Sequence, residues 1–239
     1  SKSDPLLMRK LQVLHDEFQP DVIVAVNTFP CSTACRLKST AALWADLNGW
    51  IMAEAQAQAD KLGNDDYFGH YRAMESRILA RADRFSTVSE AQKFAIYGEL
   101  AACGRVNGRT FGLDMVCSVP NATEDFKNEY GDKRLEAVPA EGVKALWLGG
   151  YNNWVDEVTL FKGVEEAMRA RADLYFVSTG GEIEGLDNKT FKKFRELVDL
   201  SHYKERFIFL GWLDTASIPS LLRSVDLGLN VDSHCLESA

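Results

Sequence analysis

The sequence predicts an α/β protein of two Rossmann-like, doubly wound domains, each with a mainly parallel sheet. Short continuous apolar runs, typical of strands buried on both faces, alternate along the 239 residues with segments of helical periodicity. In the second half, four strand–helix units follow one another within about 100 residues, the pattern of a doubly wound sheet. A charged stretch at 123–142 separates the halves. We therefore expect one domain over residues 1–138 and a second over 139–239.

Each element of the first half has a local signal. Asp4 is a favoured N-cap and Pro5 a favoured first helical residue, while Ser89 and Gln92 have the spacing of a capping box. Strands are expected at 21–26, 41–47, 85–88 and 115–119. Helices are expected from residue 5 to the break at Pro20, near 51–61, near 69–83, and from residue 89 to about 102.

The second half alternates more regularly. Strands are expected at 143–148, 174–178, 207–210 and 227–231. Helices are expected at about 156–170, at about 188–200, and in a short segment around Leu221 and Leu222. Ligands of such sheets bind at the carboxyl ends of the strands, so we expect the loops that leave these strands to hold the chemistry.

Composition and charge exclude some functions. The formal net charge is −8 and both halves are acidic, which argues against nucleic-acid binding. Five scattered cysteines indicate reduced thiols and a cytoplasmic location. Cys31 and Cys35 lack a second pair that would complete a metal site. No apolar run approaches the roughly 20 residues that a membrane-spanning helix needs.

Two glycine pairs follow expected strands. Gly149 and Gly150 leave the first strand of the second half, and Gly180 and Gly181 leave the next. Glycine lets backbone N–H groups approach a phosphate, which a helix N-terminus also attracts. The alternative is that these glycines only make tight turns.

Seven short segments, taken in order, are similar to motifs of one family. They are 82–89 (ADRFSTVS), 119–122 (VPNA), 148–150 (LGG) with 161–164 (FKGV), 176–181 (FVSTGG), 209–213 (FLGWL), 224–229 (SVDLGL) and 236–239 (LESA). Their order and spacing over 82–239 resemble the group 1, retaining glycosyltransferases of the GT-B fold. The resemblance implies two Rossmann-like domains of GT-B type, both incomplete in this chain, and a fragment that is inactive by itself.

The resemblance also implies which domain does what. Residues 1–138 would be the later part of an acceptor-side domain, and 139–239 the first part of a donor domain. The sequence departs from the family where Tyr151 or Asn152 replaces an arginine after the first glycine. It also lacks the first glutamate of a paired motif, near Asp232, and the histidine of the acceptor-side cleft. These departures leave the donor sugar and the catalytic detail open.

Candidate site residues follow from the chemistry of sugar transfer, in which a leaving pyrophosphate gains negative charge. Lys162 is the candidate that neutralises this charge, or else a solvated helix lysine. Asp46 either orients the acceptor hydroxyl or caps a strand end, and we favour the second role. The resemblance assigns Glu237 to the ribose hydroxyls. The expected donor-binding residues are Gly149, Gly150, Tyr151, Asn152, Lys162, Gly180, Gly181, Trp212, Leu213 and Glu237.

The leading hypothesis is a hexosyltransferase that uses a nucleotide-diphosphate sugar, with retention and without a metal or other cofactor. Its expected partners are the nucleotide-sugar donor and a carbohydrate, lipid-linked or other hydroxyl acceptor, with no nucleic acid. Peripheral membrane association is left open. The alternatives are a GT-B epimerase acting on a nucleotide sugar and a non-catalytic GT-B-like partner protein.

Overall fold

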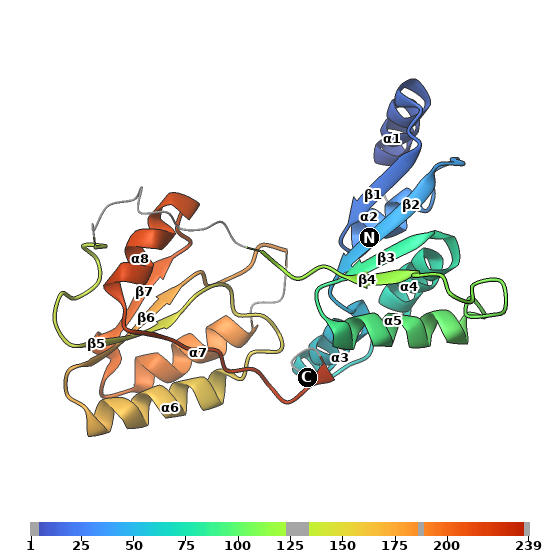
Figure 1. The fold of residues 1–239 in the computed structure, drawn as a ribbon. Coiled ribbons are helices and arrows are strands. Elements are labelled where there is room, and N and C mark those ends of the chain that lie inside the picture. The colour runs from blue at the N-terminus through green and yellow to red at the C-terminus, as the bar shows by residue number, and fades with distance from the viewer. Residues whose placement is uncertain (1–4, 123–133, 186–188, 237–239) are drawn as a thin grey trace. The chain divides into compact units, whose positions relative to one another are not determined.

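The computed structural model describes residues 5–122, 134–185 and 189–236. The chain divides into two compact units, 1–123 and 124–239. Each unit has its own parallel sheet and its own core (Figure 1). We describe each unit by itself.

The first unit contains a four-stranded parallel sheet in the order β1-β2-β3-β4. Its strands are β1 Val22–Val26, β2 Ala42–Asn48, β3 Arg84–Thr87 and β4 Val116–Ser118. Its helices are α1 Pro5–Phe18, α2 Thr28–Ala34, α3 Ile51–Leu62, α4 Phe68–Arg81 and α5 Glu90–Ala102. The helices between consecutive strands make the crossovers that a parallel sheet requires.

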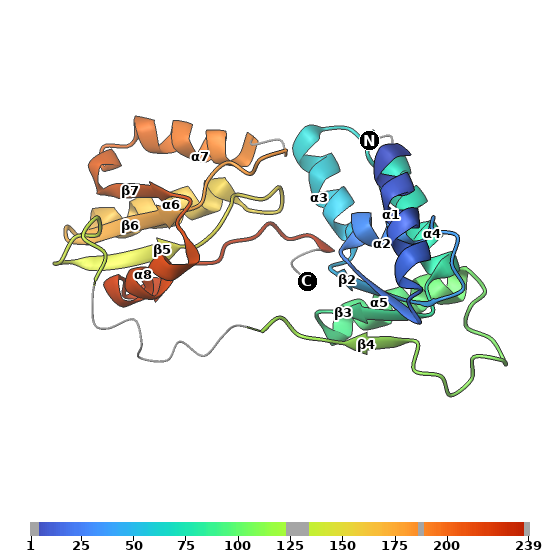
Figure 2. The same ribbon diagram turned by 90° about the horizontal axis from the view of Figure 1, so that it is seen from above.

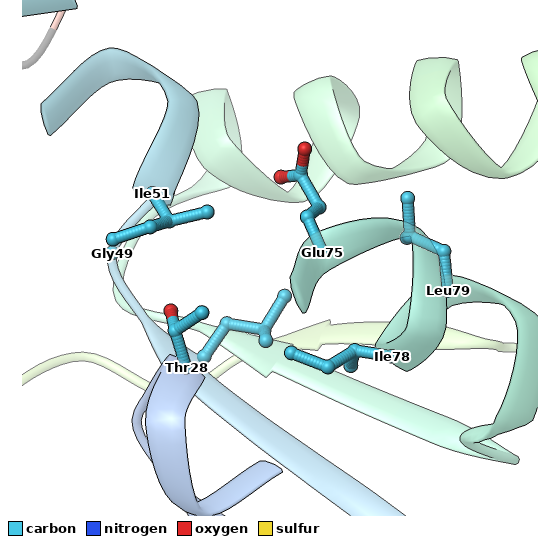
Figure 3. Close-up of a pocket in the computed structure, with 7 residues that line it drawn as sticks. Thr28, Gly49, Ile51, Glu75, Ile78 and Leu79 are labelled. Atoms are coloured by element: carbon cyan, nitrogen blue, oxygen red, sulfur yellow. The ribbon is translucent and has the colours of Figure 1, made fainter. Parts of the chain in front are cut away.

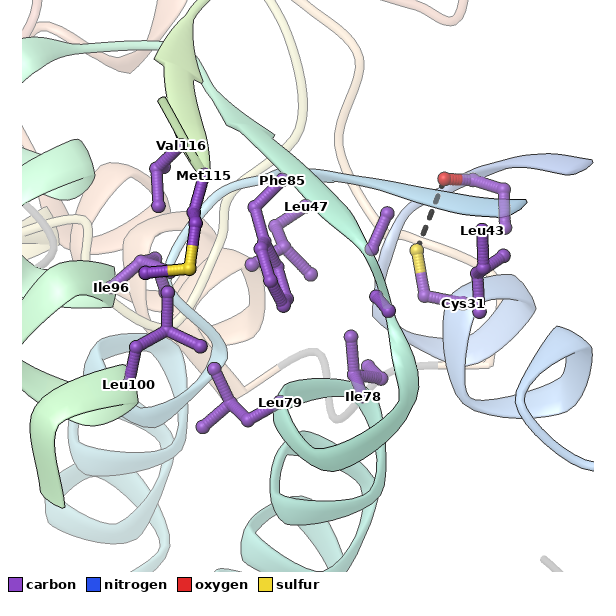
Figure 4. Packing of buried hydrophobic residues seen from close by; sticks show 13 residues of the cluster. Cys31, Leu43, Leu47, Ile78, Leu79, Phe85, Ile96, Leu100, Met115 and Val116 are labelled. Atoms are coloured by element: carbon purple, nitrogen blue, oxygen red, sulfur yellow. Dashed lines mark hydrogen bonds between the residues drawn. The ribbon is translucent and has the colours of Figure 1, made fainter. Parts of the chain in front are cut away.

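One face of the first sheet forms the core. Leu43 of β2 and Phe85 of β3 pack against Ile78 of α4 and Leu100 of α5, all almost fully buried (Figure 4). The other face is open among the described residues of this unit, because Val24 is 57% exposed and Trp44 is 37% exposed. Parallel sheets are normally covered on both faces, so this sheet has only half of its usual cover.

The second unit has a parallel sheet in the order β7-β6-β5-β8. Its strands are β5 Val143–Trp147, β6 Leu174–Thr179, β7 Phe207–Gly211 and β8 Leu227–Gly228. Its helices are α6 Glu157–Ala170, α7 Lys189–Leu200 and α8 Ile218–Ser224, with short 3-10 turns η2 Lys204–Arg206 and η3 Thr215–Ser217. Helices α6 and α7 pack on one face and α8 on the other, which gives three layers (Figure 2).

Two motif aspartates tie neighbouring strands together in the same way. The Asp83 carboxylate accepts the N–H of Leu43 at 2.8 Å, and the Asp83 N–H donates to the Leu43 carbonyl. In the second unit Asp226 makes the same two bonds with Lys144, at 2.7 and 2.9 Å. Each aspartate precedes a strand, so these motif positions fix sheet pairing rather than chemistry.

Most expected elements are confirmed, and the capping box is present: Ser89 accepts the Gln92 N–H, and Gln92 accepts the Val88 N–H. Two elements differ. Helix α2 was not expected, and it forms because Asn27, at φ +68°, turns the chain back into a short crossover. The strand expected at 227–231 is only Leu227–Gly228, since the residues after it pair with the start of α6 instead.

The polar stretch between the halves belongs partly to the second unit. Leu135 and Val138 pack with Leu146, Val177 and Leu221 on the α8 face of the second sheet. Residues 123–133 lie outside the described part of the chain. The roles of the two domains as acceptor side and donor side stay predictions.

Candidate functional site

Three loops meet at the carboxyl edge of the second sheet. They leave β5 at Gly149, β6 at Gly180 and β7 at Trp212, and they share an edge because all three strands are parallel. Backbone hydrogen bonds join them: the Gly180 N–H donates to the Gly211 carbonyl at 2.7 Å, and the Tyr151 N–H donates to Gly181 at 3.3 Å. The glycine pairs therefore form one connected surface.

Glycine is required at this edge for more than turning. Gly149 and Gly180 adopt φ of +123° and +76°, which side chains rarely permit. A Cβ on Gly180 would lie 2.1 Å from the Gly149 carbonyl oxygen, and a Cβ on Gly150 would lie 2.6 Å from the Ile183 side chain. No described residue accepts a hydrogen bond from the N–H of Gly149 or Gly150. These two N–H groups can therefore donate to a ligand oxygen.

Tyr151, expected at the donor, has its side chain in the core. It is 2% exposed, its hydroxyl and that of Ser178 are 2.8 Å apart, and its ring packs against Trp147 and Phe194. Burial raises the pKa of the Tyr151 phenol. The Tyr151 side chain thus anchors the glycine loop from below and is not presented to a ligand.

Two other expected donor residues lie on the β7 loop. Trp212 is 63% exposed, and its indole N–H donates to the Glu182 carbonyl at 2.9 Å, which holds the ring beside the β6 loop. An exposed, fixed aromatic ring suits stacking on a base or sugar. Leu213 instead packs with the α8-side cluster. Asn152 is half-buried, and its carbonyl accepts the Val155 N–H.

Lys162 lies on the exposed side of α6. Its side chain makes no hydrogen bond or ion pair with any residue that the structure describes. It is five residues beyond Glu157, about 7.5 Å along the helix axis at 1.5 Å per residue. Helical side chains lean toward the N-terminus, so the ammonium can reach back toward the helix start. The structure thus leaves the lysine free but shows no contact with the glycine loops.

The start of α6 already carries acidic groups. The Asp156 side chain caps the helix by accepting the Thr159 N–H at 2.9 Å, and Glu157 is buried in the first turn. The segment after β8 also reaches this point, where Asp232 pairs with Val155. The helix N-terminus is thus occupied, so an anion at this edge would rely on the loop N–H groups. Glu237 lies outside the described residues.

Asp46 is held within the first sheet. Its carboxylate accepts the Ser86 hydroxyl at 2.8 Å, and Ser86 in turn accepts the Trp44 indole N–H at 2.8 Å. Trp44 and Asp46 alternate along β2, and Ser86 pairs with Asp46 across the sheet, so all three lie on the open face. Asp46 thus orders this face, and its role toward an acceptor stays a prediction.

Glu75 was not among the site residues expected from the sequence. It is 6% exposed on α4 and lines a small pocket of about 10 Å³ with Thr28, Gly49 and Ile51, at the carboxyl edge of the first sheet (Figure 3). Burial, with the charge of Glu99, raises the Glu75 pKa to about 7. The nearby Trp50 indole N–H lowers that pKa but does not reach hydrogen-bond geometry in this structure.

The sequence holds a signal that could have found Glu75. Ile78 and Leu79 follow it by three and four residues, so Glu75 shares their buried helical stripe. A carboxyl group on such a stripe is uncommon and is either paired or pKa-shifted.

Among the described residues, no group of three or more His, Cys, Asp or Glu side chains could hold a metal ion. Burial raises the pKa of both the Cys31 and the Cys35 thiols, to about 12 for Cys31. None of the described helices combines the length and apolar character needed to cross a bilayer.

Comparison with known proteins identifies the fold. Family models and curated protein sequences give no match. Solved structures show that the chain has the architecture of GT-B glycosyltransferases, with Rossmann-like domains of which it covers only part.

Three of these structures are informative. A UDP-forming trehalose-phosphate synthase from Burkholderia xenovorans matches 95% of the chain and 58% of its own length, with a TM-score of 0.67 and 9% identity. The pneumococcal O-GlcNAc transferase GtfA, solved with UDP and GlcNAc, matches 94% of the chain and 40% of its own length, with a TM-score of 0.59 and 13% identity. A UDP-GlcNAc 2-epimerase from Neisseria meningitidis matches 92% of the chain and 56% of its own length, with a TM-score of 0.51 and 11% identity. The chain therefore spans about half the length of these proteins.

Proposed function

We propose that the protein to which this chain belongs is a glycosyltransferase that moves a hexose from a nucleotide-diphosphate sugar to an acceptor hydroxyl, with retention. The observation that carries the proposal is the glycine edge of the second sheet, where the N–H groups of Gly149 and Gly150 are left to a ligand. The GT-B architecture adds support, since structural neighbours were solved with UDP.

The glycine edge takes the diphosphate in this proposal. Gly149 and Gly150 donate to phosphate oxygens at a place where no Cβ obstructs the approach. The Trp212 ring, fixed by its bond to Glu182, stacks on the base or the sugar. Glu237 binds the ribose hydroxyls, as the resemblance suggests, and Lys162 supplies the positive charge that the leaving diphosphate requires.

The acceptor belongs to the first unit in this proposal. Asp46 keeps its carboxylate on the open sheet face through its bond with Ser86, so its second oxygen can accept a hydrogen bond from an acceptor hydroxyl. Retention of the anomeric configuration needs no protein nucleophile if the acceptor attacks the sugar from the same face from which the leaving group departs. A cytoplasmic location and independence from a metal cofactor remain part of the proposal.

The first test is ligand binding by the chain itself. UDP and other nucleoside diphosphates should raise its melting temperature, since a ligand at 100 times its Kd stabilises the folded state by about 2.7 kcal/mol. A thermal-shift series that includes inorganic pyrophosphate measures this effect. If no nucleotide shifts the transition at millimolar concentration, the non-catalytic partner protein becomes the better explanation.

The second test separates transfer from epimerisation. The full-length protein is incubated with a UDP-hexose, with and without acceptor, and the products are followed by NMR, which also reports the anomeric configuration. Transfer requires the acceptor and releases UDP. An altered sugar that forms without acceptor would favour the epimerase, an alternative that one structural neighbour supports. We propose that residues 1–239 alone bind nucleotide but do not transfer sugar.

A further inference from the structure

Besides the small pocket at Glu75, the first unit has a polar pocket between α2 and α4 with a volume of about 320 Å³. Three cationic or titratable basic side chains line it, and none of its lining residues is acidic. The side chains that matter are Phe29, Ser32, Thr33, Arg36, His70 and Arg77. Its size is at the lower end of sites that hold small organic ligands.

One wall of the pocket contains the buried hydroxyl of Ser32. Ser32 is 4% exposed, and its oxygen accepts a hydrogen bond from the Arg77 guanidinium at 2.6 Å. This bond holds one edge of the guanidinium against the wall and leaves its remaining N–H donors for a ligand. The Ser32 hydroxyl donates to none of the residues that the structure describes, so its own proton is also available.

Arg36 completes the charge of the pocket. It follows α2 and is exposed, and its side chain makes no hydrogen bond or ion pair with the described residues. With Arg77 it gives two guanidinium groups in one concave site, to which His70 adds a third nitrogen donor. Planar guanidinium forks match the oxygens of a phosphate better than any other side chain does.

The charge distribution favours anion binding at this pocket over non-specific attraction of anions to the whole protein. The whole sequence has a net charge of −8, so its overall field repels anions and the positive potential is local to this pocket. Phe29, 45% exposed, stands at the same pocket and offers a ring that can stack on the apolar face of a sugar.

We propose that this pocket binds a phosphate monoester carried on a sugar or polyol. The phosphate lies between Arg36 and Arg77 with Ser32 beneath it, and the carrier lies against Phe29. A soluble sugar phosphate and a phosphorylated lipid headgroup share this chemistry. All residues of this site belong to the first unit and none is part of the glycine edge of the second sheet, so the proposal does not depend on the proposed sugar transfer.

Calorimetric titration of the full chain tests the site with three probes: inorganic phosphate, glucose 6-phosphate and glucose. The two phosphates should bind, glucose 6-phosphate more tightly, and glucose should not. Arg36→Gln and Arg77→Gln should each weaken phosphate binding about tenfold or more, as loss of a charge-assisted hydrogen bond does. Arg109→Gln removes an equal charge from an exposed loop and should change nothing.

Flotation with vesicles distinguishes the two sources. Binding to phosphatidylcholine vesicles only when they contain phosphatidic acid, and its loss in Arg36→Gln, would identify a lipid headgroup; no flotation would identify the soluble ester. Arg36→Gln removes no described side-chain contact, so its folding, checked by circular dichroism, should be intact. The proposal would be overturned if no phosphate probe binds, or if Arg36→Gln and Arg77→Gln both bind phosphate as tightly as the wild type. It would also be overturned if Arg109→Gln loses as much affinity as the two pocket variants. UDP binding, measured in parallel, should be unchanged.

Discussion

Two ionisable side chains have opposite surroundings. Lys162 is exposed on α6 and makes no described contact, whereas Glu75 is buried on α4 beside apolar neighbours. An exposed ammonium stays charged and can move toward a ligand. A buried carboxyl resists ionisation, because its charged form loses solvation. The two residues therefore lead to different predictions.

Lys162→Ala in the full-length protein should lower kcat by about 10²-fold, the scale of losing a group that stabilises transition-state charge. Lys192→Ala, an exposed lysine on α7, is the matched control and should leave kcat unchanged. Steady-state kinetics with saturating donor measure both variants. Equal turnover in Lys162→Ala and the wild type would show that Lys162 is an ordinary surface lysine.

Glu75→Gln should stabilise the first unit at pH 8 and have little effect at pH 4. The Glu75 pKa is raised from 4.5 to about 7 in the folded state, so the folded protein holds a proton that the unfolded chain releases. The native glutamate therefore costs stability as pH rises from about 4.5 to 7, by up to about 3 kcal/mol at 1.36 kcal/mol per pKa unit.

Urea unfolding at several pH values checks the Glu75 prediction. Glu17→Gln, at an exposed glutamate on α1, is the matched control substitution. If Glu75→Gln changes the unfolding free energy by the same amount at pH 4 and pH 8, the carboxyl group is not the titrating element.

At the scale of elements, loop contacts decide whether the second sheet can hold a ligand. Gly180 and Gly185 both have positive φ, +76° and +81°, but only Gly180 has a neighbour where a Cβ would stand. Substituting alanine at either position costs the backbone strain of an unfavoured φ. Only Gly180→Ala also pushes the β6 loop from the Gly149 carbonyl.

Gly180→Ala should therefore destabilise the second unit by more than Gly185→Ala and should abolish UDP binding. Gly185→Ala should lower stability by about 1–2 kcal/mol, the cost of left-handed backbone at a non-glycine residue, and retain binding. Chemical denaturation and calorimetric titration measure the two effects. Retention of full UDP affinity by a folded Gly180→Ala would mean that the approach of these two loops does not form the diphosphate site.

At the scale of the whole molecule, each unit has its own hydrophobic core: among the described residues, one cluster lies in the first unit and two lie on the two faces of the second sheet. Phe85 is fully buried in the first unit and Phe194 in the second, and neither cluster includes residues of the other. Phe85→Ala and Phe194→Ala should each destabilise its own unit by about 3–5 kcal/mol, the range for removing a buried aromatic side chain. Hydrogen exchange read by mass spectrometry should show faster exchange only in the substituted unit. Equal acceleration in both units would show that they unfold together.

Local sequence rules predicted much of this architecture. Continuous apolar runs predicted strands such as β1 and β6, of which only β6 is buried on both faces, and Ser89 with Gln92 predicted a helix start that the structure contains. The glycine loops could also be placed, because parallel strands bring their carboxyl ends to one edge. The motif aspartates were found by resemblance, but their bonds to Leu43 and Lys144 were not foreseen.

The sequence by itself determined the fold class, the order of the strands along the chain and the loops that carry the glycine pairs, because each depends on residues close in sequence. Only the tertiary structure decided that the Tyr151 side chain is core, that Glu75 is buried and that Arg36 and Arg77 share a pocket with Ser32. Burial, pKa and pocket charge depend on residues that are distant in the chain and become neighbours only when the helices pack on their sheets.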